Sequence, residues 1–181
     1  GPGRPDGRPE ERTSRGRRFT ILGAGHIGGR IARPLKALGA ASVTGVSRSG
    51  KSREPAFDAV YPIGELDAVL RTSECLICVL PSTPETRGLF TAEKFALLPQ
   101  GAIFINVGRG DFLDQDALMD ALKSGHLAGA AIDVANPEPL PPEHPLWDCP
   151  NLILTPHIAG GLVPLARSRD DNAALFLENL R

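Results

Sequence analysis

The sequence predicts an α/β fold built on a doubly wound, mostly parallel β-sheet. From Phe19 onward, short apolar runs alternate along the chain with amphipathic segments of helical period. The apolar runs are continuous, which is typical of strands that are buried on both faces by helices. Right-handed crossovers between such strands give a doubly wound sheet. A glycine-rich turn directly after the first apolar run favours the same architecture.

Composition excludes several classes of protein. The 181 residues carry 20 basic and 21 acidic side chains, so a general nucleic-acid binder is not expected. No apolar run approaches the roughly 18 residues that span a bilayer, and no signal-peptide core is present near the start. Three cysteines do not form a disulfide framework. We therefore expect a cytoplasmic protein whose partners include neither a nucleic acid nor a membrane.

Residues 1–18 differ in composition from the remainder. They hold six arginines and three acidic residues, with no aliphatic or aromatic side chain. Such a segment cannot bury enough apolar surface to order itself. We therefore predict a disordered tail or linker over residues 1–18 and one folded domain over residues 19–181.

The hydrophobic pattern places strands and helices in alternation. Strands are expected at residues 19–22, 42–46, 59–63, 75–80, 102–107, 128–134 and 151–154. Helices are expected at residues 27–38, 65–72, 92–98, 114–123 and 165–180. The segment 136–150 holds six prolines and is predicted to be an irregular loop.

The first helix has an unusual feature. Its apolar residues Ile27, Ile31, Leu35 and Leu38 recur at helical spacing. Pro34 lies among them and is expected to remove one hydrogen bond and kink the axis.

Cys75 and Cys78 form a CxxC pair within an apolar run. In an extended strand these two side chains point to opposite faces. No second pair of ligands accompanies them. The pattern therefore favours two buried cysteines over a metal or redox site, and no metal is expected.

The glycine-rich turn GAGHIG at residues 23–28 matches GxGxxG, between a predicted strand and a predicted helix. Gly23 permits the tight turn, Gly25 lets the backbone approach a pyrophosphate, and Gly28 allows close packing of helix and strand. The helix N-terminus offers free N–H groups and partial positive charge to the phosphates. This context predicts a dinucleotide site, with a structural glycine turn as the alternative.

The residues after the second strand indicate which dinucleotide binds. NAD sites usually place an acidic residue there to bind the ribose 2′-hydroxyl. This chain has Ser47, Arg48 and Ser49 instead, followed by Lys51. Arg48 can bind a 2′-phosphate through two nitrogens, with the serines as neutral donors. We predict NADP(H) in preference to NAD(H); the alternative is a solvated basic loop.

Several further motifs follow in a fixed order. They are LPSTPETRG at residues 80–88, INVGRG at 105–110, AIDV at 131–134, PEP at 137–139 and TPHIAG at 155–160. With the glycine turn, this set resembles the NAD(P)-binding domain of the D-isomer-specific 2-hydroxyacid dehydrogenases, in the branch of the glyoxylate/hydroxypyruvate reductases. The resemblance runs from about Phe19 to the end and implies a Rossmann-like domain over residues 19–181.

The resemblance also implies functional residues. The family's catalytic arginine, glutamate and histidine fall on Arg109, Glu138 and His157. Arginine can bind the carboxylate of a 2-keto acid, and histidine can exchange a proton with its carbonyl oxygen while a carboxylate orients the ring. Implied cofactor contacts are His26, Ile27, Leu80, Pro81, Thr86, Val107, Gly108, Arg109, Asp133, His157, Ala159 and Gly160. His126 and His144 match no motif, and we interpret them as structural.

Members of this family are usually about twice this length. We therefore expect the substrate domain to be essentially absent from this chain, and expect cofactor binding with little turnover by the chain alone. The resemblance further implies a small 2-keto or 2-hydroxy acid as substrate and a homodimer. The segment 140–147 is a candidate contact, with a structural hydrophobic plug as the alternative. A non-catalytic dinucleotide sensor or corepressor-like module is the alternative function.

Overall fold

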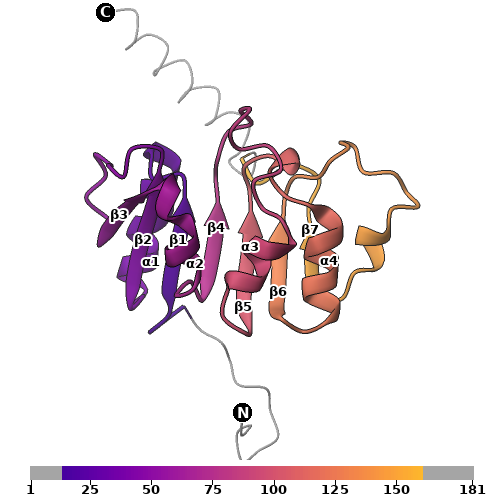
Figure 1. The fold of residues 1–181 in the computed structure, drawn as a ribbon, viewed down its shortest axis with the longest axis horizontal. Helices are drawn as coiled ribbons and strands as arrows, with labels where there is room; N and C mark the ends of the chain where they lie inside the picture. The colour runs from indigo at the N-terminus through magenta and orange to yellow at the C-terminus, as the bar shows by residue number, and fades with distance from the viewer. Residues whose placement is uncertain (1–13, 161–181) are drawn as a thin grey trace, which may run out of the picture.

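The computed structural model describes residues 14–160, which form one seven-stranded parallel sheet in the order β3-β2-β1-β4-β5-β6-β7. Figure 1 shows the sheet with the loops after β4, β5 and β6 gathered at one edge. The strands are β1 (Arg18–Leu22), β2 (Ser42–Ser47), β3 (Ala59–Pro62), β4 (Cys75–Cys78), β5 (Ala102–Asn106), β6 (Leu127–Ile132) and β7 (Leu152–Leu154). The α-helices are α1 (His26–Ala37), α2 (Leu66–Leu70), α3 (Ala92–Leu97) and α4 (Gln115–Lys123).

The predicted α/β class is confirmed, and each strand and helix expected between residues 19 and 154 is present with ends that differ by at most two residues. The proline-rich segment is irregular as predicted, except for a short 3₁₀ helix, Pro145–Asp148. The helix expected at residues 165–180 lies outside the described residues. No helix within residues 14–160 is long and apolar enough to cross a membrane.

The predicted boundary between tail and domain differs from what the structure shows. Arg18 is already the first residue of β1. The preceding turn is joined to the domain, because the N–H of Gly16 donates to Gly39 O at 2.8 Å and that of Ala41 donates to Arg17 O at 2.9 Å. These backbone hydrogen bonds order the chain from at least Ser14, although no apolar side chain anchors it. Residues 1–13 lie outside the described part of the chain.

The sheet separates two hydrophobic clusters. The larger cluster lies under α2, α3 and α4, which Figure 1 shows in front of the sheet. Four phenylalanines form its centre, with ring centroids 4.7–5.5 Å apart: Phe90, Phe95, Phe104 and Phe112. The smaller cluster lies under α1 and includes Phe19, Ile21 and Val43. Both faces of the central strands are therefore buried, as their continuous apolar sequences predict.

The apolar face predicted for the first helix is partly wrong. Ile27 and Leu38 are 61% and 60% exposed. The buried residues of α1 are Gly28, Gly29 and Ala32. Gly28 and Ala32 face the sheet because α1 lies close to β1, and the predicted residues Ile31 and Leu35 pack against the smaller cluster.

The helix α1 continues through Pro34 to Ala37. Pro34 has no N–H to donate to the carbonyl of Arg30, one turn earlier. Both residues are exposed. Water can bind that carbonyl, so the missing hydrogen bond does not end the helix.

Cys75 and Cys78 lie in β4 and pack into the two different clusters, so the predicted opposite orientation is confirmed. Burial raises the pKa of each thiol to about 12, which keeps both protonated at neutral pH. A thiolate is the form that ligates metals and attacks disulfides, so these cysteines serve as core residues.

Candidate active site and cofactor site

The glycine-rich turn begins where β1 ends. Gly23 has a φ of 110°, and a Cβ on it would lie 2.8 Å from the side chain of Val79. A Cβ on Gly28 would lie 2.1 Å from Gly23 O. A Cβ on Gly25 would meet no protein atom within 4 Å. The tight turn at Gly23 and the close packing at Gly28 are thus confirmed, and the space over Gly25 is open on the side where a pyrophosphate needs to approach.

A cavity of about 520 Å³ lies beside this turn, at the carboxyl ends of β1, β2 and β4. It includes five residues that the sequence indicated: Ser47, Arg48, Leu80, Pro81 and Thr86. Its other lining residues were not predicted: Leu22, Val46, Ile63, Thr83, Glu85 and Leu89. The wall is thus mainly apolar, with charged groups from two loops, as in sites for a flat ring that carries polar substituents.

The loop after β2 carries unpaired positive charge. Within residues 14–160, no carboxylate lies within ion-pair distance of Arg48, Lys51 or Arg53. Glu54, the first acidic residue of this loop, is held by Arg33 at 2.6 Å. The loop therefore carries three cations without a partner carboxylate in the described part of the chain, and Arg48 among them lines the cavity.

The three predicted polar contacts in this loop are not equivalent. The Ser47 hydroxyl donates to Lys51 O at 2.9 Å and accepts from the Lys51 N–H at 3.1 Å, so it closes the turn itself. Arg48 and Ser49 are exposed. Of these three residues, Ser47 and Arg48 line the cavity and Ser49 does not.

The loop after β4 is held by its own side chains. The Thr86 hydroxyl donates to Pro81 O at 2.6 Å and accepts from the Thr83 N–H at 2.8 Å. Asp111 Oδ2 accepts from the Ser82 hydroxyl at 2.6 Å and lies 3.2 Å from Arg87 Nε. These contacts join the cavity wall to the turn that follows β5.

Arg109 lies on that turn, which Asn106 shapes. Asn106 is fully buried; its Oδ1 accepts from the Gly108 N–H at 3.0 Å and its Nδ2 donates to Arg109 O at 2.9 Å. Gly110 packs so closely on Ala135 that a Cβ would lie 2.0 Å from Ala135 O. The side chain of Arg109 is exposed, and its Nη1 donates to Gly108 O at 2.6 Å. It forms no ion pair within the described residues, so its other nitrogens can bind an anion.

Glu138 and His157 form a direct pair. His157 Nδ1 lies 3.0 Å from Glu138 Oε2, while Glu138 Oε1 accepts from the Ala135 N–H at 3.1 Å. The two side chains are 40% and 47% exposed, at the edge of an apolar cavity of about 340 Å³ that includes Trp147. Glu138 is thus fixed from the backbone and fixes the imidazole ring in turn.

Asp133, at the end of β6, holds the loop that carries His157. Its Oδ1 accepts from the Thr155 hydroxyl at 2.5 Å and the Ile158 N–H at 2.9 Å, and its Oδ2 accepts from the Ala159 N–H at 2.9 Å. Burial raises the pKa of the Asp133 carboxyl, but these hydrogen bonds and the His157 charge outweigh burial and leave the pKa below its ordinary value. The backbone of His157 has the left-handed conformation, with φ 56°, and the hydrogen bonds to Asp133 stabilise it.

The remaining predicted residues lie along the same edge. The Val107 N–H donates to Cys78 O at 3.0 Å, and a Cβ on Gly108 would lie 2.7 Å from Leu80 O, so this stretch lies against the end of β4. His26 and Ile27 are the first residues of α1 and are exposed, and Gly160 has open space around it.

The two histidines interpreted as structural have structural contacts. His126 Nε2 lies 2.9 Å from Phe95 O, and His144 Nδ1 accepts from the Leu146 N–H at 3.2 Å. Within residues 14–160 no group of three or more potential metal ligands occurs.

Comparison with known proteins identifies the family. Residues 4–159 match the model of the family described as D-isomer specific 2-hydroxyacid dehydrogenase, NAD binding domain. The chain belongs to this family. The match begins earlier and ends earlier than the resemblance predicted from Phe19 to the end.

Individual members of the 2-hydroxyacid dehydrogenase family are about two fifths identical to the chain over the aligned residues. A glyoxylate reductase/hydroxypyruvate reductase of Mus musculus is 38% identical over 162 residues, which cover 88% of this chain and 48% of the relative. The chain spans about half the length of the relatives that it matches.

Solved structures of family members show the same fold. A phosphoglycerate dehydrogenase from Lactobacillus plantarum superimposes with a TM-score of 0.79 at 37% identity, covering 84% of this chain and 49% of the other. An NADPH-dependent glyoxylate/hydroxypyruvate reductase from Sinorhizobium meliloti, in complex with NADP and sulfate, has a TM-score of 0.73 at 40% identity. The alignment with this reductase covers 79% of this chain and 46% of the reductase.

The residues present fit the dinucleotide that the family binds. The open space over Gly25 and the uncapped N-terminus of α1 suit a pyrophosphate. The adjacent cavity suits a nucleoside. Sequence reasoning missed Asn106 and Thr155, which hold Arg109 and His157 in place. Asn106 could have been found from the sequence, because it is a polar residue at the end of a continuous apolar strand.

Proposed function

We propose that this chain provides the NADP(H) site and the acid–base residues of an enzyme that reduces a small 2-keto acid to a 2-hydroxy acid. The 3.0 Å contact between His157 and Glu138 carries the proposal, because it pairs a proton donor with a carboxylate that orients it. When bound, the reduced nicotinamide supplies the hydride.

The side chains divide the remaining work. Arg109 binds the substrate carboxylate through its exposed guanidinium. Glu138 accepts a hydrogen bond from Nδ1–H of His157, which leaves Nε2–H to protonate the carbonyl oxygen of the substrate. Asp133 keeps the His157 loop in place through its hydrogen bonds to Thr155, Ile158 and Ala159.

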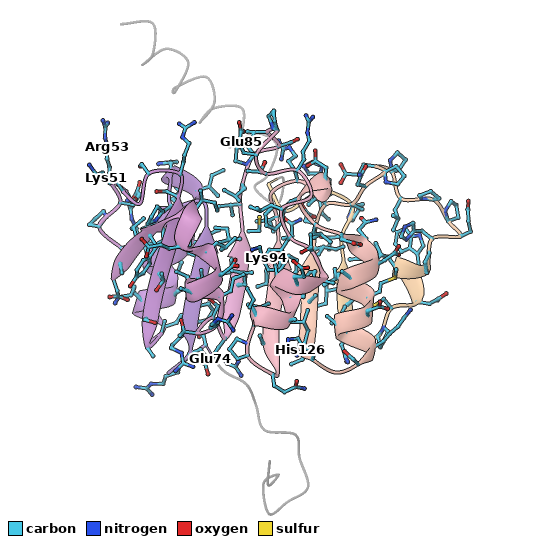
Figure 2. All side chains as sticks on the ribbon, in the orientation of Figure 1. Lys51, Arg53, Glu74, Glu85, Lys94 and His126 are labelled. Atoms are coloured by element: carbon cyan, nitrogen blue, oxygen red, sulfur yellow. The ribbon has the colours of Figure 1, made fainter. Side chains whose placement is uncertain are left out.

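The acid–base assignment is tested by steady-state kinetics in a form of the protein that includes a substrate-binding domain, with glyoxylate and hydroxypyruvate among a panel of 2-keto acids. His157→Ala is expected to lower kcat by about 10²–10⁴-fold. His126→Ala, at the opposite edge of the sheet (Figure 2), is the control and is expected to keep kcat. Cofactor binding with no reduction of any keto acid would favour the sensor alternative instead.

We infer that the cofactor is NADP(H) in preference to NAD(H). The unpaired cations of the loop after β2 and the lack of an acidic residue over residues 47–53 support this preference. The structures of relatives in complex with NADPH or NADP are consistent with it.

The preference is tested by calorimetry on the 181-residue chain. Arg48→Ala is expected to weaken NADPH binding by about 10- to 100-fold, the range for a hydrogen bond to a charged group, and to change NADH binding little. Arg71→Ala, an exposed arginine after α2, is the control. An unchanged Kd for NADPH in Arg48→Ala would refute the preference.

We also propose a homodimer. Trp147 and Ile153, at and near β7, are 51% and 67% exposed, which is consistent with an apolar contact surface there. The cytoplasmic location expected from the sequence stays a prediction.

A further inference from the structure

The cavity at the carboxyl ends of β1, β2 and β4 contains one acidic side chain. Glu85 belongs to the loop after β4, and Arg48 belongs to the loop after β2. Both line the same cavity of about 520 Å³. Because β2 and β4 lie on opposite sides of β1 in the sheet, the two charges reach the cavity from opposite walls.

Glu85 lies at the edge where a nucleotide phosphate would lie. Figure 2 shows Glu85 at the same edge of the sheet as Lys51 and Arg53, opposite the edge of Glu74 and His126. The side chain is exposed and forms no ion pair within 4 Å among residues 14–160. Glu85 and Arg48 thus line one cavity without forming an ion pair with each other, so one ligand in that cavity can meet both charges.

The carboxyl group is ionised at neutral pH. Hydrogen bonds from the Thr83 hydroxyl and from its own backbone N–H lower the pKa of Glu85, and the charge of Arg48 lowers it further. The cavity thus holds a permanent negative charge that acts on whatever Arg48 binds.

We propose that Glu85 is a specificity-determining residue of the cofactor site: its carboxylate opposes a phosphate on the ribose 2′ oxygen and so limits the preference for NADP(H) over NAD(H). This inference rests on the proposed assignment of Arg48 to the 2′-phosphate. A phosphate monoester carries nearly two negative charges at neutral pH, whereas the 2′-hydroxyl of NAD(H) carries none. Both nucleotides share the charged pyrophosphate, so the carboxylate weakens binding of NADP(H) more than binding of NAD(H).

The test is a set of calorimetric titrations of the 181-residue chain with NADPH and with NADH at pH 8 and low ionic strength. Glu85→Gln keeps the size of the side chain and removes its charge. It is expected to tighten NADPH binding about two- to fivefold, the range for exposed charge pairs, with less than a twofold change for NADH. Glu85→Lys is expected to tighten NADPH binding further. Both effects are expected to shrink in 1 M salt, where the Debye length is about 3 Å.

Glu143→Gln is the matched control, because it removes the same charge from an exposed glutamate outside the cavity. An NADPH affinity in Glu85→Gln that equals that of wild type or of Glu143→Gln would overturn the inference. Weaker NADH binding in Glu85→Gln would also overturn it, since the carboxylate would then bind the ribose hydroxyls.

Failure of the underlying assignment gives a different result. If Arg48→Ala weakens NADPH binding but Glu85→Gln does not tighten it, only the role of Glu85 is wrong. If Arg48→Ala leaves the NADPH affinity unchanged, or if the wild-type chain binds neither nucleotide, both proposals are wrong.

Discussion

At the scale of single residues, Asp133 is the side chain on which the geometry of His157 depends. It is 4% exposed, and three donors from the next loop converge on its carboxylate. The backbone contributes as well, because the His157 N–H donates to Asp133 O at 2.8 Å. The resemblance implied a contact between Asp133 and the cofactor, which stays a prediction, but it did not imply this supporting role.

Asp133→Asn is expected to lower the free energy of unfolding by about 1.5–3 kcal/mol at pH 7, because one amide hydrogen then faces the N–H groups that the carboxylate bound. Chemical denaturation measures this change, with Asp120→Asn on the exposed side of α4 as control. A loss no larger than that of the control would contradict the role.

Asp133 also makes the free energy of unfolding depend on pH. The pKa of Asp133 is lower in the folded chain than in the unfolded chain. Its stabilising contribution is therefore present above the unfolded value of about 4 and is lost as the pH falls through the folded pKa. Wild type and Asp133→Asn are expected to converge in stability below about pH 4. A stability difference that stays constant from pH 7 to pH 3 would exclude this linkage.

At the scale of elements, the turn between β1 and α1 separates two functions of glycine. Gly28 has no room for a side chain because Gly23 O is too close, whereas Gly25 has room and a φ of −94° that other residues adopt readily. Folding requires a glycine at position 28, whereas at position 25 we expect the requirement to come from the bound nucleotide.

Gly28→Ala is therefore expected to destabilise the fold by about 1–3 kcal/mol or more, as overpacking does. Gly25→Ala is expected to unfold at the wild-type temperature and yet bind NADPH about tenfold or more weakly. Thermal unfolding and calorimetry on both variants measure the two effects. Equal destabilisation of the two variants would show that the space over Gly25 is not open in solution.

The elements themselves were predictable from local pattern. The strand β4 reads as a continuous apolar run and α4 begins with Asp114 as a side-chain cap, so both followed from neighbouring residues. The buried face of α1 followed from this pattern only in part. Ile31 and Leu35 pack against the smaller cluster as their spacing predicts, whereas Ile27 and Leu38 are exposed. The close approach of α1 to β1 places the small residues Gly28 and Ala32 in the interior.

At the scale of the whole molecule, apolar side chains remain exposed near β7. The proposed homodimer predicts a mass near twice 19.2 kDa by light scattering of the wild-type chain. Trp147→Ser is expected to lower the dimer fraction, because Trp147 is a large exposed aromatic side chain in the candidate contact. Ile27→Ser, which removes an equally exposed apolar side chain at the glycine turn, is expected not to. A monomer mass for the wild-type chain would remove the dimer proposal.

The sequence alone determined the order of strands and helices, the glycine turn and the motif residues Arg109, Glu138 and His157, because each depends on neighbours in the chain or on a motif of fixed spacing. Only the tertiary structure decided which residues line the cavity at the carboxyl ends of β1, β2 and β4, and that Glu85 faces the same space as Arg48. Those relations join loops that are far apart in sequence, and the parallel sheet brings them together by placing the carboxyl ends of all its strands at one edge.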